Sequence, residues 1–317
     1  MGKGSENEQF VNVADGRVLS YIVFGPGNSS PTAAGMKVVY LHGFFSGKFE
    51  AAIVAERAAA QGVTLIAIDR PGYGGSTNDP NRTPETFAKD VQVLLDSILK
   101  PDKGVIFWGV SGGSPYASAC AALLPERAKA LILAVPFACL TANEEDELAI
   151  GINAKTNAQL INVRKHPKRA KFMMQLLAFL QRTPLRICLL RAGGFPKVDL
   201  ETVKAYPDRQ RGLNKAARAG VRPGLKGQMR DLELMSTYGF DEALMKSIEC
   251  PAHIWCGALD TVTPITHAQA YARSIPKAEL HVVPDMGHFM GFKHGSEVLA
   301  SGVKSASASL CSPSYSF

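Results

Sequence analysis

The sequence lacks most features that identify secreted, membrane-spanning or metal-stabilised proteins. Its longest apolar runs, such as ALILAV at 130–135, are far shorter than the roughly 20 residues of a membrane-spanning helix. The polar start MGKGSENEQ has no apolar signal-peptide region. The six cysteines form no Cys-x-x-Cys pair and no His spacing typical of zinc. We therefore expect a soluble, cytoplasmic protein with buried free thiols and no metal.

Phosphate-binding motifs are also missing. No Gly-x-x-x-x-Gly-Lys loop occurs, and no Gly-x-Gly-x-x-Gly follows the first strand expected in the sheet. We therefore expect no cofactor, and the positive net charge of +7 comes with no recognised nucleic-acid motif. With 46% hydrophobic and 20% charged residues in 317, the composition is that of an ordinary globular protein with a substantial core.

Strand and helix patterns alternate along most of the chain. Residues 9–25 contain two short β-like runs separated by Asp15-Gly16, which predicts an antiparallel hairpin. Further strands are expected at 37–43, 63–70, 104–109, 129–135, 252–257 and 279–284. Helices are expected at 48–61, 83–99, 114–124, 264–275 and 288–300, with Thr83 as an N-cap. The alternation predicts an α/β fold with a mostly parallel sheet.

A long segment interrupts this alternation. Residues 137–236 have helical patterns without strand alternation, and KRAKFMMQLLAFLQR at 168–182 is the clearest amphipathic helix. We predict a core domain from 1–136 and 237–304, a helical cap at 137–236 and a flexible tail at 305–317. Between residues 155 and 230 there are 18 Lys and Arg against three acids, a net charge of +15. The cap is therefore basic and the remainder of the chain acidic.

One short motif carries the chemistry. Gly109-Val110-Ser111-Gly112-Gly113 lies between an expected strand and an expected helix. Glycines two residues before and after the serine allow a sharp turn that exposes its hydroxyl. A helix that begins just after Ser111 also directs N–H groups toward a developing oxyanion.

Four segments together resemble the α/β-hydrolase superfamily, in that family's order along the chain. LHG at 41–43 is similar to its oxyanion loop, and DRPGYGGS at 69–76 to its turn after the next strand. GVSGGSPYA at 109–117 is similar to its nucleophile elbow, and DMGH at 285–288 to its histidine loop. The resemblance implies an eight-stranded, mostly parallel sheet and the order serine, acid, histidine. It is closest to the esterase-like group of that superfamily.

The resemblance assigns a set of candidate site residues. It implies Ser111 as nucleophile, His288 as its base and Asp260 as the acid that orients the histidine. An N-cap of the following helix is the alternative role for Asp260. The oxyanion hole is implied to be the N–H groups of Phe44 and Gly112. The other histidines are expected to be structural or superficial: His42 in the oxyanion loop, His253 and His281 on strands, and His166, His267 and His294 at the surface.

The cap leaves several alternatives for substrate and partners. Phe45 and Phe44 either wall the pocket or belong to the core, and the apolar residues of 172–180 are expected to pack onto the core and line a pocket. The basic charge either is solvated, or holds an anionic substrate group through Arg182, Arg186 and Arg191, or contacts an acidic membrane surface weakly. The sequence leaves the oligomeric state open.

Three functions agree with these residues. The first is a carboxylesterase-like serine hydrolase that cleaves a small or medium ester, thioester or related acyl compound through an acyl-enzyme on Ser111. The second is a lyase, cyclase or C–C bond-cleaving enzyme that uses the same groups as acid and base. The third is a non-enzymatic ligand receptor on a hydrolase scaffold.

Overall fold

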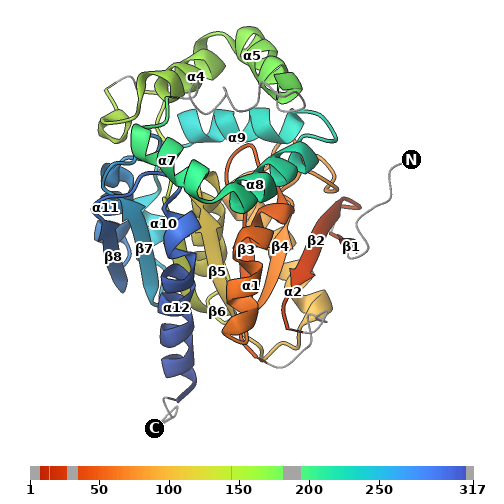
Figure 1. The fold of residues 1–317 in the computed structure, drawn as a ribbon. Coiled ribbons are helices and arrows are strands. Elements are labelled where there is room, and N and C mark those ends of the chain that lie inside the picture. The colour runs from red at the N-terminus through yellow and green to blue at the C-terminus, as the bar shows by residue number, and fades with distance from the viewer. Residues whose placement is uncertain (1–7, 14, 27–34, 144, 181–193, 312–317) are drawn as a thin grey trace.

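The centre of the molecule is one eight-stranded sheet (Figure 1). The computed structural model describes residues 8–13, 15–26, 35–143, 145–180 and 194–311. The strands are β1 Glu8–Asn12, β2 Val18–Phe24, β3 Lys37–Leu41, β4 Thr64–Ile68, β5 Val105–Val110, β6 Ala128–Ala134, β7 Ala252–Gly257 and β8 Ala278–Val283. They lie in the order β1-β2-β4-β3-β5-β6-β7-β8, with β2 antiparallel to both β1 and β4 and all other pairs parallel. The predicted mostly parallel sheet with an antiparallel hairpin is confirmed.

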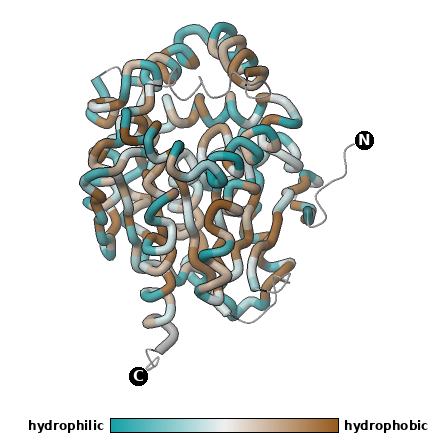
Figure 2. The backbone as a smooth tube through the Cα atoms, in the orientation of Figure 1, coloured by the Kyte–Doolittle hydropathy of each residue, from teal (hydrophilic) through white to brown (hydrophobic). Residues whose placement is uncertain are grey.

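Helices cover both faces of the sheet, which explains why its central strands are continuous apolar runs. Alternate residues of β3 point to opposite faces, Val39 and Leu41 to one core cluster and Val38 and Tyr40 to the other. The first face is covered by α2 Pro84–Ile98, α3 Ser114–Leu123, α10 Glu242–Lys246 and α11 Ile265–Ser274, the second by α1 Ala52–Ala60 and α12 Met290–Cys311. Figure 2 shows hydrophobic residues concentrated in the strands between these layers.

The ends of individual elements follow local sequence signals. Thr83 caps α2, because its side-chain oxygen accepts the Thr86 N–H and the Thr86 hydroxyl oxygen accepts the Thr83 N–H. A short 3₁₀ turn, η1 Lys48–Ala51, precedes α1. Four cysteines within the described residues are free and buried, as predicted, namely Cys120, Cys139, Cys250 and Cys256.

The last helix corrects the predicted tail. We expected the closing helix to end near residue 300 and residues 305–317 to be flexible, but α12 is helical through Cys311. Residues 305 and 306 pack on the sheet, because Ala306 is fully buried and the Ser305 hydroxyl lies 2.8 Å from His253 Nε2. Residues 312–317 lie outside the described part of the chain. We predicted flexibility because the sequence is rich in serine, but small side chains such as Ala306 also allow a helix to pack closely on the sheet.

The insertion between β6 and α10 forms the cap above the sheet (Figure 1). Its helices in the described residues are α4 Ala154–Lys165, α5 Pro167–Leu180, α7 Lys197–Ala205, α8 Pro207–Gly220 and α9 Lys226–Thr237. None of the helices that the structure describes is long and apolar enough to cross a membrane.

Helix α5 differs from the prediction for its apolar residues. Met174 is buried and Leu177 lines the pocket, but a row of large apolar side chains is exposed, namely Phe172, Met173, Leu176 and Phe179. The physical reason is position, because α5 is the outermost cap helix and packs against α4 (Figure 1). The membrane-surface contact of the cap stays a prediction.

A buried ionic network joins the cap to the core. The carboxylate of Asp231 on α9 accepts hydrogen bonds from Arg70, at 2.6 Å, and from Arg82. The hydroxyls of Tyr73 and Tyr116 donate to the same carboxylate, each at 2.7 Å. Burial by itself would raise the pKa of Asp231, but the two guanidinium groups outweigh it and hold the pKa well below its usual range.

We predict that Asp231→Asn lowers the free energy of unfolding by about 3 to 5 kcal/mol, since it leaves two buried guanidinium groups without their counterion. Urea denaturation followed by circular dichroism measures the change. The matched control is Asp208→Asn, an exposed acid of the cap. Equal, small losses in both variants would contradict a structural role for the network.

Candidate active site

Ser111 lies at a strained turn directly after β5. Its φ is +50°, a conformation that residues other than glycine rarely adopt. A Cβ atom at Gly113 would lie 2.2 Å from the carbonyl oxygen of Leu41, and one at Gly109 would lie 2.8 Å from the Cβ of Ala117. The two glycines are therefore required for the backbone to pass between β3 and α3, and the turn leaves Ser111 lining a cavity.

His288 and Asp260 meet at the carboxyl ends of the two last strands. Asp260 follows β7 and His288 follows β8, and Asp260 Oδ2 lies 2.8 Å from His288 Nδ1. The other oxygen, Oδ1, accepts the N–H groups of Val262 and Thr263 at 2.8 and 3.0 Å. The loop before α11 thus fixes the carboxylate through Oδ1, and Oδ2 accepts the Nδ1–H of His288. The alternative role of Asp260 as N-cap of the following helix was wrong, because the N-cap of α11 is Pro264 and no side chain caps it. Asp260 instead binds its own loop and the histidine.

The electrostatic environment of His288 favours its protonated form. Burial by itself would lower the pKa of His288, but the charge of Asp260 and its hydrogen bond, together with Asp199 and Glu50, raise it above the ordinary value. The ring therefore gains a proton more readily than a free histidine does. His288 and Ser111 both line the same cavity.

The backbone groups expected to form an oxyanion hole lie next to each other. The Phe44 nitrogen is 3.3 Å from the position that a Cβ atom on Gly112 would occupy. The neighbouring N–H of Gly43 is directed to the Glu50 carboxylate, at 3.2 Å from each oxygen. The N–H of Gly43 is therefore used by Glu50, and the N–H of Phe44 is the one that lies beside Gly112.

The loop that carries Phe44 is held from behind. His42 is fully buried, with its Nδ1–H donating to the Gly43 carbonyl at 2.8 Å and its Nε2 accepting the Arg70 N–H at 3.3 Å. Arg70 also donates to the carbonyl oxygens of His42 and Gly43. Since Arg70 is the partner of Asp231, the cap and this loop share one arginine.

Sequence reasoning missed two buried carboxylates near His288. Asp199, on the cap helix α7, is fully buried and accepts the N–H of Phe289 at 2.9 Å. Burial raises its pKa. Glu50, from η1, accepts the hydroxyl of Tyr40 at 3.0 Å in addition to the Gly43 N–H. Both residues lie in helical segments where acids are usually exposed, so no local signal distinguished them.

One histidine prediction was wrong. His267 was expected at the surface, but it is fully buried on α11. Its Nδ1 accepts the N–H of Ala138 at 3.1 Å, and its Nε2 donates to the carbonyl of Leu148 at 2.7 Å. Burial lowers its pKa to about 4, so the ring is neutral. It ties the start of the cap insertion to the core.

The cavity above Ser111 is mostly apolar. It encloses about 330 Å³ between the core and the cap. Phe44 and Phe45, which follow Gly43, both line it. The further apolar side chains include Leu160, Met174, Leu177, Phe195, Leu213 and Phe289. No Lys or Arg occurs among the described lining residues. The predicted substrate contacts Arg182, Arg186 and Arg191 lie outside the described residues.

Comparison with known proteins identifies the family. A family model for the alpha/beta hydrolase fold matches residues 37–295, so the chain belongs to the α/β-hydrolase family and is an enzyme of that fold. It is 27% identical over 262 residues to pimeloyl-[acyl-carrier protein] methyl ester esterase of Chromobacterium violaceum, covering 82% of this chain and 90% of the relative. It is 24% identical over 285 residues to the uncharacterized hydrolase YcgS of Bacillus subtilis, covering 87% and 90%.

Solved structures agree with this assignment at the level of the fold. An esterase from Exiguobacterium antarcticum superposes with a TM-score of 0.66 at 19% identity, over 93% of this chain and 98% of that one. The resemblance to α/β hydrolases that the sequence motifs predicted is therefore confirmed, together with the sheet architecture.

Replacing Asp260 by Asn is expected to lower kcat toward an ester on the order of 10⁴-fold, because the amide selects the wrong tautomer of His288. Circular dichroism should show an intact fold. A loss of only a few-fold would mean that another group orients the ring.

Replacing Asp199 by Asn should move the pH dependence without abolishing activity. The wild-type acid limb of kcat/KM is expected above the ordinary histidine pKa of 6.5, since a histidine used as a general base must be neutral and the pKa of His288 is raised. Removing the negative charge of Asp199 lowers the pKa of His288, so the limb shifts to lower pH. Glu201→Gln, an exposed acid on the same helix, is the matched control. An unmoved limb in Asp199→Asn would show that the two groups are not coupled.

Proposed function

We propose that the protein is a serine esterase that cleaves a small or medium carboxylic ester through an acyl-enzyme on Ser111. The observation that carries this proposal is the combination of a strained serine turn and an acid-held histidine at one apolar cavity. The membership of the α/β-hydrolase family agrees with it.

The reaction proceeds in two halves. Ser111 Oγ attacks the ester carbonyl while His288 accepts its proton, and the resulting oxyanion receives hydrogen bonds from the N–H groups of Phe44 and Gly112. His288 then gives the proton to the leaving alcohol. In the second half His288 activates a water molecule, which attacks the acyl group and releases the acid. The Asp260 carboxylate stabilises the imidazolium in both halves.

The cavity favours an uncharged, apolar acyl group. Its described lining contains no Lys or Arg to pair with a carboxylate, while Leu160, Met174 and Leu177 supply apolar surface from the cap. Glu50 also lies at this cavity and, in its ionised form, would repel a carboxylate placed beside it. A neutral alkanoyl ester therefore fits the described wall better than an anionic one.

Ser111→Ala is expected to abolish both labelling by a fluorophosphonate probe and turnover of p-nitrophenyl esters. The physical reason is loss of the attacking oxygen, and intact-protein mass spectrometry measures the adduct. Ser114→Ala, a buried serine three residues later on α3, is the matched control. Labelling at Ser111 with negligible ester turnover would instead favour a lyase or cyclase.

Lengthening the acyl chain of the ester should raise kcat/KM by up to about fourfold per methylene until the cavity is filled, because each buried methylene is worth about 0.8 kcal/mol. An ester with a terminal carboxylate is expected to react more slowly than its methyl-ended equivalent of the same length. A faster reaction of the charged ester, lost in Arg182→Ala, Arg186→Ala or Arg191→Ala, would establish the anionic alternative.

A further inference from the structure

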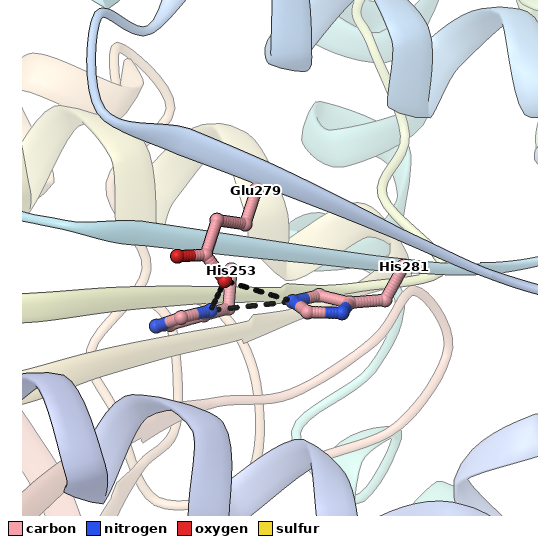
Figure 3. Close-up of side chains that lie close together, drawn as sticks. All are labelled: His253, Glu279 and His281. Atoms are coloured by element: carbon pink, nitrogen blue, oxygen red, sulfur yellow. Dashed lines mark hydrogen bonds and ion pairs between the residues drawn. The ribbon is translucent and has the colours of Figure 1, made fainter.

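Three potential metal ligands meet on one face of the sheet, away from the cavity. The register of β7 and β8 pairs His253 with Glu279 and Trp255 with His281. Because side chains two residues apart on a strand point to the same face, all four lie together. Figure 3 shows His253, Glu279 and His281 converging, with the ring nitrogens and the carboxylate facing one another.

The distances between the donor atoms match a metal site. His253 Nδ1 lies 3.3 Å from His281 Nε2, and Glu279 Oε2 lies 3.4 Å from the first nitrogen and 3.7 Å from the second. Around a tetrahedral Zn²⁺ with bonds of about 2.0 to 2.1 Å, neighbouring ligand atoms are separated by about 3.3 to 3.4 Å. The triangle of Figure 3 therefore needs only small shifts to hold an ion.

The surroundings fix the two rings. Ser305 on α12 lies 2.8 Å from His253 Nε2 and can accept its N–H, which directs the Nδ1 lone pair toward His281 and Glu279. Trp255 stacks on His281 with centroids 4.3 Å apart and planes 16° apart, and its own N–H donates to Ser301.

The three side chains differ in their exposure to solvent. The side chain of Glu279 is 68% exposed and that of His281 29%, while His253 is 5% exposed. An ion can therefore enter past Glu279 and keep water as its fourth ligand. Two imidazoles and one carboxylate suit Zn²⁺ and similar transition metals better than Mg²⁺ or Ca²⁺, which prefer oxygen ligands.

We propose that His253, Glu279 and His281 form a binding site for a divalent transition-metal ion of the zinc type, which clamps the edge strand β8 to β7. The role is structural. His253 precedes the end of β7 at Gly257 by four residues, about 13 Å of strand at 3.3 Å per residue, so the ion does not reach the group of residues around Ser111.

The test uses the full chain, stripped with a chelator and returned to chelator-free buffer. Titration with ZnCl₂ against a chromophoric chelator should give one zinc bound per chain, and the melting temperature should rise with zinc concentration. Replacement by Co²⁺ should give the visible spectrum of a four- or five-coordinate ion. Absence of zinc binding to the wild-type chain would overturn the proposal.

Two variants locate the ion. Glu279→Gln and His281→Asn are both expected to weaken zinc binding at least about tenfold and to remove the rise in melting temperature. Both side chains are partly exposed, and their ester turnover without metal should equal that of the wild type, which shows an intact fold. Glu249→Gln and His166→Asn, at exposed positions elsewhere, are the matched controls. Unchanged affinity in both site variants would place the zinc elsewhere and overturn the proposal.

Discussion

The buried carboxylate of Asp231 connects the cap to the loop that carries Phe44. It lies on a cap helix but takes its hydrogen bonds from Arg70, Arg82 and two tyrosines of the core. Arg70 in turn holds the carbonyl groups behind Phe44. A charge buried this completely is tolerated only when several partners satisfy it. The contact between Arg70 and Asp231 therefore helps to hold the cap on the core and to fix the loop beside Ser111.

Both the core and the cap therefore contribute residues to the site. The core supplies Ser111, Asp260 and His288 at the carboxyl ends of parallel strands, where loops from neighbouring strands converge. The cap supplies Asp199, which binds the backbone of the histidine loop and raises the pKa of His288. The cap also closes the cavity with apolar side chains. Its influence on the proposed chemistry is thus electrostatic as well as steric.

The sequence predicted those parts whose signals are local. Buried strands are short apolar runs, and the turn at Ser111 is indicated by Gly109 and Gly113, where the backbone has no room for a side chain. The network around Asp231 was not predictable, because 161 residues separate it from Arg70 and an acid on a cap helix resembles a solvated one. The same reason hid Asp199. The exposed row on α5 was misplaced because amphipathicity indicates an apolar face but not what covers it.

The proposed zinc site shows the same limitation in a different form. His253 and Glu279 are 26 residues apart, so no spacing motif joins them, and only the register of β7 with β8 makes them neighbours. These two strands also end in the loops of Asp260 and His288. Strand β8 is an edge strand, paired on one side only, and its outer residues are largely exposed. An ion at mid-strand would fix β8 without contacting the reacting groups. It would thereby stabilise the strand from which the loop of His288 starts.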